Sequence, residues 1–190
     1  MKMLYLDTET TGLNAETDEL ISISGIIENT GRIEEFDFMM CPQCVEDIKP
    51  EILGITGLTK EEIKTFEGPA IVYYKLIKLF DRHINKFDRS DKFTVVGYNV
   101  RFDVSFLHAF FKQNKNDYLF SYLGDQLDVY EMTKIYRFVS TREGSTSLIK
   151  SLKLSDICEH FSIKFDAHKS IEDIRATRKL FETLIGKMYA

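Results

Sequence analysis

The apolar positions in the first part of the chain predict three strands. Residues 2–9 contain the apolar run Leu4–Leu6, and residues 19–28 form a second apolar segment. The sequence 29–31 (Asn-Thr-Gly) is typical of a hairpin turn, and residues 32–40 then alternate apolar and polar side chains, as in a half-buried strand. Because short turns join antiparallel neighbours, we expect these three strands to be antiparallel.

The pattern then changes to the longer period of helices. Apolar runs at 93–98 and 126–129 favour a fourth and a fifth strand, the fourth parallel to the first. The polar, weakly patterned residues 137–151 favour a loop. A capping-box sequence, Thr59-Lys-Glu-Glu62, favours a short helix. Longer helices are expected over 69–87, 103–112, 130–136, 152–161 and 170–189. The order of elements predicts an α/β fold with one five-stranded mixed sheet flanked by helices.

Length and composition narrow the class of protein. The chain has 190 residues, 44% hydrophobic and 29% charged, which suits a single domain over 1–190. No apolar run is long enough to cross a bilayer, and the first residues lack the apolar core of a signal peptide. Three cysteines, an odd number, favour a reducing compartment. We therefore expect a cytoplasmic protein without a membrane partner.

The net charge of −5 argues against a protein that coats nucleic acid nonspecifically, since such proteins are usually basic. It does not exclude an enzyme that meets nucleic acid at one site, because bound metal ions offset local carboxylates.

Asp7 and Glu9 are the first candidates for chemistry. They end the first predicted strand, and alternation along a strand places both on one face. Two carboxylates on one face suit a hard divalent cation. Taken alone, the pair is equally typical of a solvated strand end.

Asp103 is the second candidate. It closes the segment Gly97–Asp103, which joins the fourth strand to the next helix. A carboxylate at a helix N-terminus is favoured by the helix dipole, so Asp103 has a purely structural explanation as well.

His168 and Asp173 form the third candidate, with four residues between them. The same spacing recurs at His83 and Asp88, so it is weak evidence alone. Ser170 and Asp173 also resemble a helix-capping pair. The setting favours His168, because it lies in a predicted loop just before the last helix.

In this order, the segments Asp7-Thr-Glu9-Thr-Thr-Gly, Asn99-x-x-Phe102-Asp103 and His168-x4-Asp173 resemble the DEDDh 3′→5′ exonuclease superfamily. That family includes the proofreading (epsilon) subunit of the bacterial replicative polymerase, oligoribonuclease and RNase T. Residues 50–59 and 151–158 also resemble family segments. The resemblance implies an RNase H-like fold.

The resemblance also implies a mechanism. Asp7, Glu9, Asp103 and Asp173 would bind two Mg²⁺ or Mn²⁺ ions, and His168 would be the general base, since histidine titrates near neutral pH. The expected reaction is hydrolysis at the 3′ end of single-stranded DNA, releasing nucleoside monophosphates.

Substrate contacts follow from the same resemblance. The residues that it places near the terminal nucleotides are Thr8, Gly12, Leu13, Glu51, Thr56, Phe102 and Phe106. At their spacing, Phe102 and Phe106 are equally typical of core residues. Thr56 and Tyr98 stand where some relatives carry histidine, which bears on specificity rather than on metal binding.

Other functions remain open on the sequence alone. RNA could replace DNA as the substrate, or the fold could serve as a noncatalytic nucleic-acid-binding module or hold only a structural cation. A polymerase domain does not fit in 190 residues. We therefore expect either a free-standing exonuclease or one that associates with a DNA polymerase.

Two further motifs have mainly structural interpretations. The segment 137–153 is basic, because it contains Arg137, Arg142, Lys150 and Lys153 against the single acidic residue Glu143. These side chains could contact phosphates, but a charged segment of this kind is usually only solvated. Cys41 and Cys44 form a CxxC, and Cys158 and His160 could complete a zinc site in principle. Their separation in sequence argues against zinc.

Overall fold

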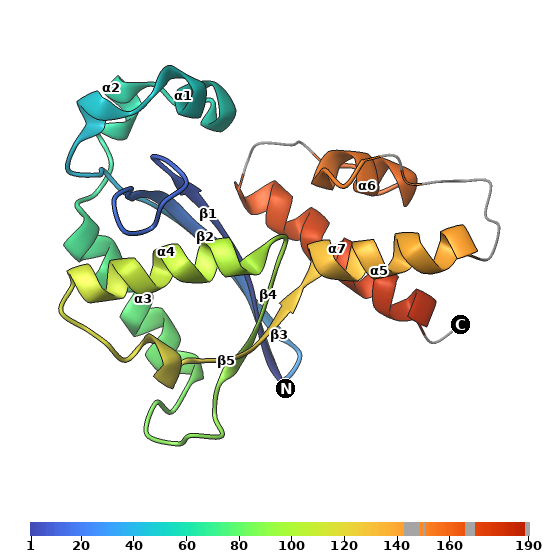
Figure 1. The fold of residues 1–190 in the computed structure, drawn as a ribbon. Coiled ribbons are helices and arrows are strands. Elements are labelled where there is room, and N and C mark those ends of the chain that lie inside the picture. The colour runs from blue at the N-terminus through green and yellow to red at the C-terminus, as the bar shows by residue number, and fades with distance from the viewer. Residues whose placement is uncertain (143–148, 150, 166–169, 189–190) are drawn as a thin grey trace.

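The computed structural model describes residues 1–142, 149, 151–165 and 170–188, and its centre is one five-stranded sheet (Figure 1). The order across the sheet is β3-β2-β1-β4-β5. The strands are β1 (Lys2–Thr10), β2 (Leu20–Asn29), β3 (Arg32–Met39), β4 (Phe93–Gly97) and β5 (Leu123–Asp128).

The strand directions agree with the sequence-based prediction. β1 pairs antiparallel with β2, and β2 pairs antiparallel with β3. β4 is parallel to both β1 and β5. The predicted five-stranded mixed sheet is confirmed.

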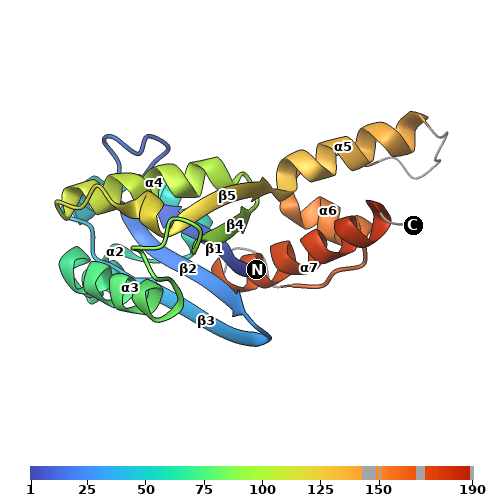
Figure 2. The same ribbon diagram turned by 90° about the horizontal axis from the view of Figure 1, so that it is seen from below.

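Helices cover both faces of the sheet, as the two views in Figures 1 and 2 show. Two short 3-10 helices, Val45–Asp47 and Leu119–Ser121, lie between the longer elements. The α-helices are α1 (Pro50–Thr56), α2 (Lys60–Ile63), α3 (Pro69–His83), α4 (Val100–Gln113), α5 (Val129–Arg142), α6 (Leu154–His160) and α7 (Ser170–Met188).

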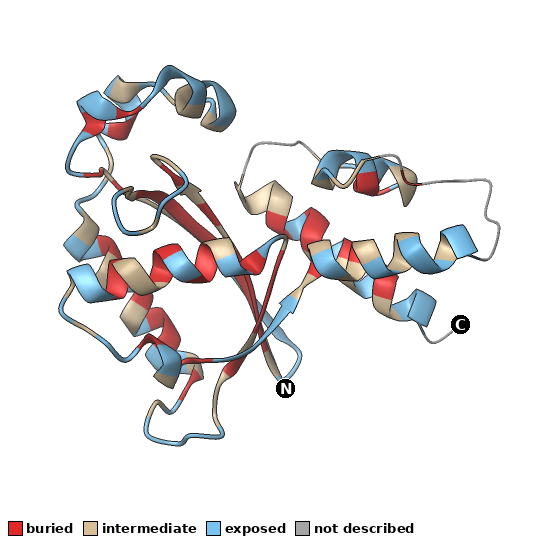
Figure 3. Ribbon diagram, viewed as in Figure 1, coloured by how far each residue is buried: buried red, intermediate tan, exposed pale blue. Residues whose placement is uncertain are grey.

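Alternation along β1 divides the core into two layers. Leu4 and Leu6 pack in a cluster with apolar side chains of α3 and α4. Met3 and Tyr5, which point the other way, pack with side chains of α5, α6 and α7. The fully buried residues therefore concentrate in the sheet and on the inner faces of the helices (Figure 3).

A third, smaller cluster lies under α1 and α2. Ile21, Val45, Ile48 and Ile63 form it. Thr59 caps α2 with the predicted capping box, since Glu62 N donates to its hydroxyl and Thr59 N donates to the Glu62 carboxylate. Figure 1 places α1 and α2 beyond the C-terminal end of β1.

Several predicted boundaries need correction. Residues 137–142 belong to α5 rather than to a loop, because no Gly or Pro interrupts the chain between Val129 and Arg142. Phe138 and Val139 are exposed, so the end of the helix lacks the buried stripe on which the prediction relied. The predicted helix over 69–87 ends at His83, where Ile84 becomes extended and buried.

Two other differences are local. α1 was not predicted, since Pro50–Thr56 has no buried residue and therefore no clear helical stripe. The fifth strand covers Leu123–Asp128 rather than 126–129, because it is an edge strand whose central residues are exposed and polar. The helix predicted over 152–161 spans Leu154–His160.

No helix within the described part of the chain is both long and apolar enough to span a bilayer.

Replacing Gly25 by alanine should destabilise the sheet. A Cβ at Gly25 would lie 2.5 Å from the Phe36 ring and 2.7 Å from the Tyr5 carbonyl oxygen. Overpacking of this kind costs about 1–3 kcal/mol, so we expect the urea midpoint of Gly25→Ala to fall.

The matched control is Gly54→Ala in α1, where a Cβ would meet nothing within 4 Å. Its midpoint should stay the same or rise, because alanine favours a helix by up to ~1 kcal/mol over glycine. Equal midpoints for Gly25→Ala and the unaltered protein would contradict the packing argument.

Candidate active site

The end of β1 extends beyond its parallel neighbour. Lys2–Tyr5 pair with Phe93–Val96, and β4 stops at Gly97 while β1 continues to Thr10. The last residues of β1 therefore have no strand beside them on the β4 side. Backbone donors in this stretch need other acceptors.

Asp103 supplies one of these acceptors. Its Oδ1 accepts hydrogen bonds of 2.9 Å from both the backbone N–H and the hydroxyl of Thr8. Asp103 is only 3% exposed. The two bonds fix the Asp103 carboxylate of α4 against β1. Its other oxygen, Oδ2, takes part in neither of these two hydrogen bonds.

The start of α4 brings Asp103 to this position. Asn99 precedes the helix in the left-handed conformation, with φ 68° and ψ 44°, and its N–H donates to Asp128 Oδ1 at 2.9 Å. The helix begins at Val100, three residues earlier than predicted, so Asp103 lies within the first turn rather than at its start.

Asp7 and Glu9 lie on the opposite face of β1 from Thr8, because side chains alternate along a strand. This is the face of Tyr5, which packs in one cluster with residues of α7. Ser22 pairs with Glu9 in the sheet, and its hydroxyl oxygen lies 3.4 Å from that of Ser170, the first residue of α7. The first turn of α7, which contains Asp173, therefore begins beside Glu9.

Shifted pKa values indicate that the four carboxyl groups share one electrostatic environment. Burial raises the pKa of Asp7 well above its usual range, and the charges of Asp103, Glu9 and Asp173 raise it further. Burial, assisted by the charge of Asp173, raises the pKa of Glu9 to about 7. Burial also raises the pKa of Asp103 to about 7, although the bonds from Thr8 oppose the shift. The predicted site thus gathers carboxylates from β1, α4 and α7.

The chemistry of this set fits divalent cations. Carboxylate oxygens are the ligands that Mg²⁺ and Mn²⁺ prefer, and a cation would offset the repulsion that raises these pKa values. Among the described residues, no three His, Cys, Asp or Glu side chains have the geometry to hold an ion as they stand.

His168 lies outside the described residues, so its predicted role as general base stays a prediction. The rival spacing at His83 has a different setting. His83 Nε2 lies 2.9 Å from Glu34 Oε2, and its carbonyl oxygen accepts from Lys2 at the opposite end of β1.

Gly12 and Leu13 lie in the loop that follows β1. A Cβ at Gly12 would lie 2.3–2.6 Å from the Asp18 carboxylate, so a larger residue would have to displace that side chain. Asp18 in turn accepts from the backbone N–H of Asn14. Leu13 is 85% exposed, which leaves its side chain available for contact beside the carboxylates.

The remaining predicted substrate residues differ in accessibility. Glu51 is exposed on α1, whereas the Thr56 hydroxyl is bonded to the Ile52 carbonyl oxygen at the end of that helix. Phe102 is half-buried, with its ring centroid 4.9 Å from that of Phe106.

Phe106 and Thr8 require corrections. Phe106 is 1% exposed and packs in the core, so its ring is not at the surface of the site. Thr8 is buried, and its hydroxyl donates to Asp103. Its side chain therefore orients that carboxylate and is not exposed for contact with a substrate.

The basic segment and the cysteines have structural surroundings of their own, although Cys158 feels the charge of Asp173. Arg142 lies on α5 with its guanidinium 5.8 Å from the Phe138 ring centroid, and Lys150 and Glu143 lie outside the described residues. Cys41 packs against the small cluster under α1 and α2, and Cys158 is buried in the cluster under α7. Burial raises the pKa of the Cys158 thiol to about 12, which disfavours the thiolate that zinc requires.

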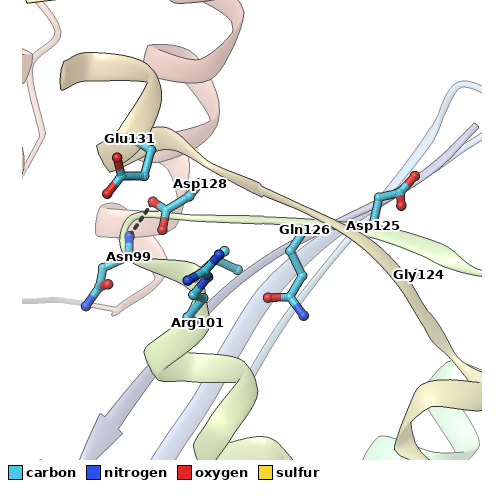
Figure 4. Close-up of a pocket in the computed structure, with 8 residues that line it drawn as sticks. Asn99, Arg101, Gly124, Asp125, Gln126, Asp128 and Glu131 are labelled. Carbon is cyan, nitrogen blue, oxygen red and sulfur yellow. Dashed lines mark hydrogen bonds between the residues drawn. The ribbon is translucent and has the colours of Figure 1, made fainter. Parts of the chain in front are cut away.

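Asp128 is a supporting residue that the sequence reasoning missed. It ends β5 and accepts from the N–H groups of Asn99 and Tyr130. With Asn99, Arg101 and Gln126 it lines a cavity of about 800 Å³ (Figure 4). An aspartate directly before a helix is a capping signal, and that signal was available in the sequence.

Comparisons with known proteins agree with this arrangement. Residues 4–181 match the family model RNase_T, described as an exonuclease. The chain is 28% identical to "DNA polymerase III PolC-type" of Caldanaerobacter subterraneus subsp. tengcongensis over 98% of its own length and 12% of that protein. It is 24% identical to "Ribonuclease T" of Haemophilus ducreyi, over 97% of this chain and 85% of that protein.

The fold also matches a solved structure. Exonuclease I of E. coli, in complex with a dT13 oligonucleotide, superposes with a TM-score of 0.76 at 21% identity. The match covers 98% of this chain and 41% of that one. This likeness confirms the predicted RNase H-like fold.

Without metal, the protein should lose stability as the pH rises. The raised carboxyl pKa values mean that the folded state binds more protons than the unfolded state, so this contribution is lost as the pH passes through about 7. We expect the melting temperature in EDTA to fall between pH 5.5 and pH 8, and to fall less for Asp7→Asn. Adding Mn²⁺ at pH 8 should raise the melting temperature of the unaltered protein more than that of Asp7→Asn.

Asp117→Asn, at an exposed position, is the control and should behave like the unaltered protein. At pH 8 in EDTA, Asp7→Asn should be more stable by about 1 kcal/mol, or about 2–4 °C. A less stable Asp7→Asn under these conditions would contradict the repulsion argument.

Proposed function

The chain belongs to the RNase_T exonuclease family, within the DEDD exonuclease superfamily, and from this membership we propose that it is a metal-dependent 3′→5′ exonuclease. The substrate in this proposal is the 3′ end of single-stranded DNA. The products are nucleoside monophosphates, released one at a time.

One observation carries the proposal: carboxylates from three distant segments are held together where β1 ends. Asp7 and Glu9 come from β1, Asp103 from α4 and Asp173 from α7. Their mutual effects on pKa support a single site. A fold that needed only stability would not gather like charges in this way, because each buried carboxylate costs free energy.

Asp7, Glu9, Asp103 and Asp173 are the residues that would hold two Mg²⁺ or Mn²⁺ ions. When bound, such ions lower the pKa of water and offset charge on the leaving oxygen of a phosphodiester. Thr8 contributes by fixing the orientation of the Asp103 carboxylate through its two hydrogen bonds. That orientation is then set before the substrate arrives.

His168 would accept the proton of the attacking water, as a general base working near neutral pH. Leu13 and the half-buried ring of Phe102 offer apolar surface to the terminal bases. Glu51, exposed on α1, would contact the terminal nucleotide in this proposal. In this proposal the carboxylates hold the metal ions and the apolar side chains contact the terminal bases.

DNA is the substrate that we favour, because the chain resembles a polymerase III and a structure of exonuclease I with a dT13 strand. A 3′→5′ exoribonuclease is the second candidate, supported by the similarity to a protein named Ribonuclease T. The chain matches 12% of a polymerase III relative. We therefore propose that it can also act in association with a DNA polymerase.

A 5′-labelled single strand should shorten from its 3′ end in the presence of metal. We expect a ladder of products with Mg²⁺ or Mn²⁺, none with EDTA, and none with Asp7→Ala. Matched DNA and RNA strands, run side by side on a gel, show which sugar is preferred.

Asp117→Ala, an exposed change away from the carboxylates, is the matched control and should give the same ladder as the unaltered protein. Binding of both strands without shortening under any metal would reject the enzyme and favour a noncatalytic binding module. Shortening in EDTA would reject the metal dependence.

Replacing His168 by alanine should lower turnover about 100-fold or more, the usual contribution of a general base. Mn²⁺ affinity, measured by calorimetry without nucleic acid, should change less than about threefold, since His168 is not among the proposed metal ligands. Near-normal turnover of His168→Ala would remove its assigned role, and His168→Gln serves as a second variant closer in size.

A further inference from the structure

The outer side of α4 carries a line of hydrogen-bond donors. Arg101, Ser105, His108 and Lys112 recur at the spacing of one helical face, and we call these four residues the α4 track. The opposite side of the same helix is the apolar side that packs in the core. The track therefore faces outward along the whole helix.

The cations of the α4 track are available for a ligand. Arg101 and Lys112 are exposed, and neither takes part in an ion pair with any described residue. The Ser105 hydroxyl donates to the Phe102 carbonyl oxygen, so it must give up that bond to donate to a phosphate. The His108 ring lies against Phe120, with 5.2 Å between ring centroids.

The surface is hollowed beside the track. A cavity of about 440 Å³ lies between α4 and the loop after β1, lined by Ala15, Glu16, Ser105, His108 and Lys112 among others. At the start of the helix, Arg101 lines the separate cavity of about 800 Å³ shown in Figure 4, where Asp125, Asp128 and Glu131 also lie. The donors thus line concave surface rather than a flat helix.

The track and the carboxylate site share α4 but lie on different sides of it. Asp103, in the first turn, is buried against β1, whereas Arg101 is exposed on the outer side. The loop that carries Leu13 also supplies the Glu16 wall of the smaller cavity. From Arg101 to Lys112 the helix rises about 16 Å, the length of roughly three to five nucleotides.

We propose that the α4 track binds the phosphodiester backbone of the substrate strand, several nucleotides upstream of the 3′ end. The chain has a net charge of −5, and Arg101 and Lys112, which form no ion pair within the described ranges, would attract a polyanion locally. The inference rests on the proposed function only for the position of the 3′ end. Phosphates are common to DNA and RNA, so both strands fit the track.

Glu16 indicates on which side of the smaller cavity the strand would run. It is the acidic residue on the opposite wall of the smaller cavity, and its charge repels a phosphate. The strand therefore runs along the helix side, and removal of the Glu16 charge should strengthen binding.

Binding of labelled oligonucleotides in EDTA tests the track without cleavage. Fluorescence anisotropy with 3-nucleotide and 12-nucleotide single strands, as DNA and as RNA, gives the affinity for each length. The double variant Arg101→Ala/Lys112→Ala should bind the 12-nucleotide strands roughly tenfold more weakly, with a much smaller loss for 3 nucleotides. The slope of log affinity against log salt should fall by about 1.4, which is about 0.7 for each cation removed.

Lys78→Ala/Lys179→Ala is the matched control, since both lysines are exposed on other helices, α3 and α7. It should leave both lengths unchanged, and Glu16→Gln should tighten the 12-nucleotide complex about twofold. Lys112→Arg, which keeps the charge, should bind like the unaltered protein.

Three results would overturn the proposal: no binding of the 12-nucleotide strand by the unaltered protein, equal losses for both lengths, or equal losses in the control variant. The outcome is independent of catalysis. If the protein shortens strands but the track variants bind both lengths normally, the proposed function stands and the track proposal is rejected. If the track variants lose affinity only for the longer strand but no strand is shortened, the track proposal stands and the proposed function is rejected.

Discussion

The two hydrogen bonds from Thr8 to Asp103 hold the site together. They join a strand and a helix at the point where β4 has ended and β1 no longer has a parallel neighbour. A bond to an ionised acceptor is about twice as strong as a neutral one, and here it also satisfies a backbone donor that would otherwise lie buried. One carboxylate therefore completes the sheet edge and supplies a group for chemistry, and α4 cannot shift along β1 without losing both.

The same interaction limits the repulsion among the four carboxyl groups. Burial and like charge raise the pKa of Asp7 and Glu9, whereas the donors on Thr8 pull the pKa of Asp103 downwards. The site is thus less stable than a neutral core would be, and the two apolar layers around β1 offset that cost. A cation bound between the carboxylates would reduce their mutual repulsion, and this repulsion is the reason that a cation would bind favourably there.

The sheet could be predicted from sequence because its signals are local, and the four carboxylates stay a prediction of metal ligands. Alternation in β1 places Asp7 and Glu9 on one face, and an ordered set of motifs adds Asp103 and Asp173. The length of α5 could not be predicted in this way, because its last turns are exposed and carry no buried stripe. Phe106 was ambiguous for a related reason: spacing alone does not distinguish a core face from a site face, and only the packing against β1 and α3 decides it. The role of Thr8 depends on where β4 ends, which is a property of two strands together.

The carboxylates come from opposite ends of the chain, Asp7 in the first strand and Asp173 in the last helix. A ribosome makes β1, β2 and β3 first, and these strands pair with one another through short turns. The last helix, which packs across β1 and β2 and brings the fourth carboxylate, appears only after all five strands have been made. A growing or truncated chain that stops before α7 can therefore build most of the sheet, yet it has an incomplete set of ligands. If Asp173 is a metal ligand as proposed, a chain that stops before it would lack hydrolytic capacity toward nucleic acid.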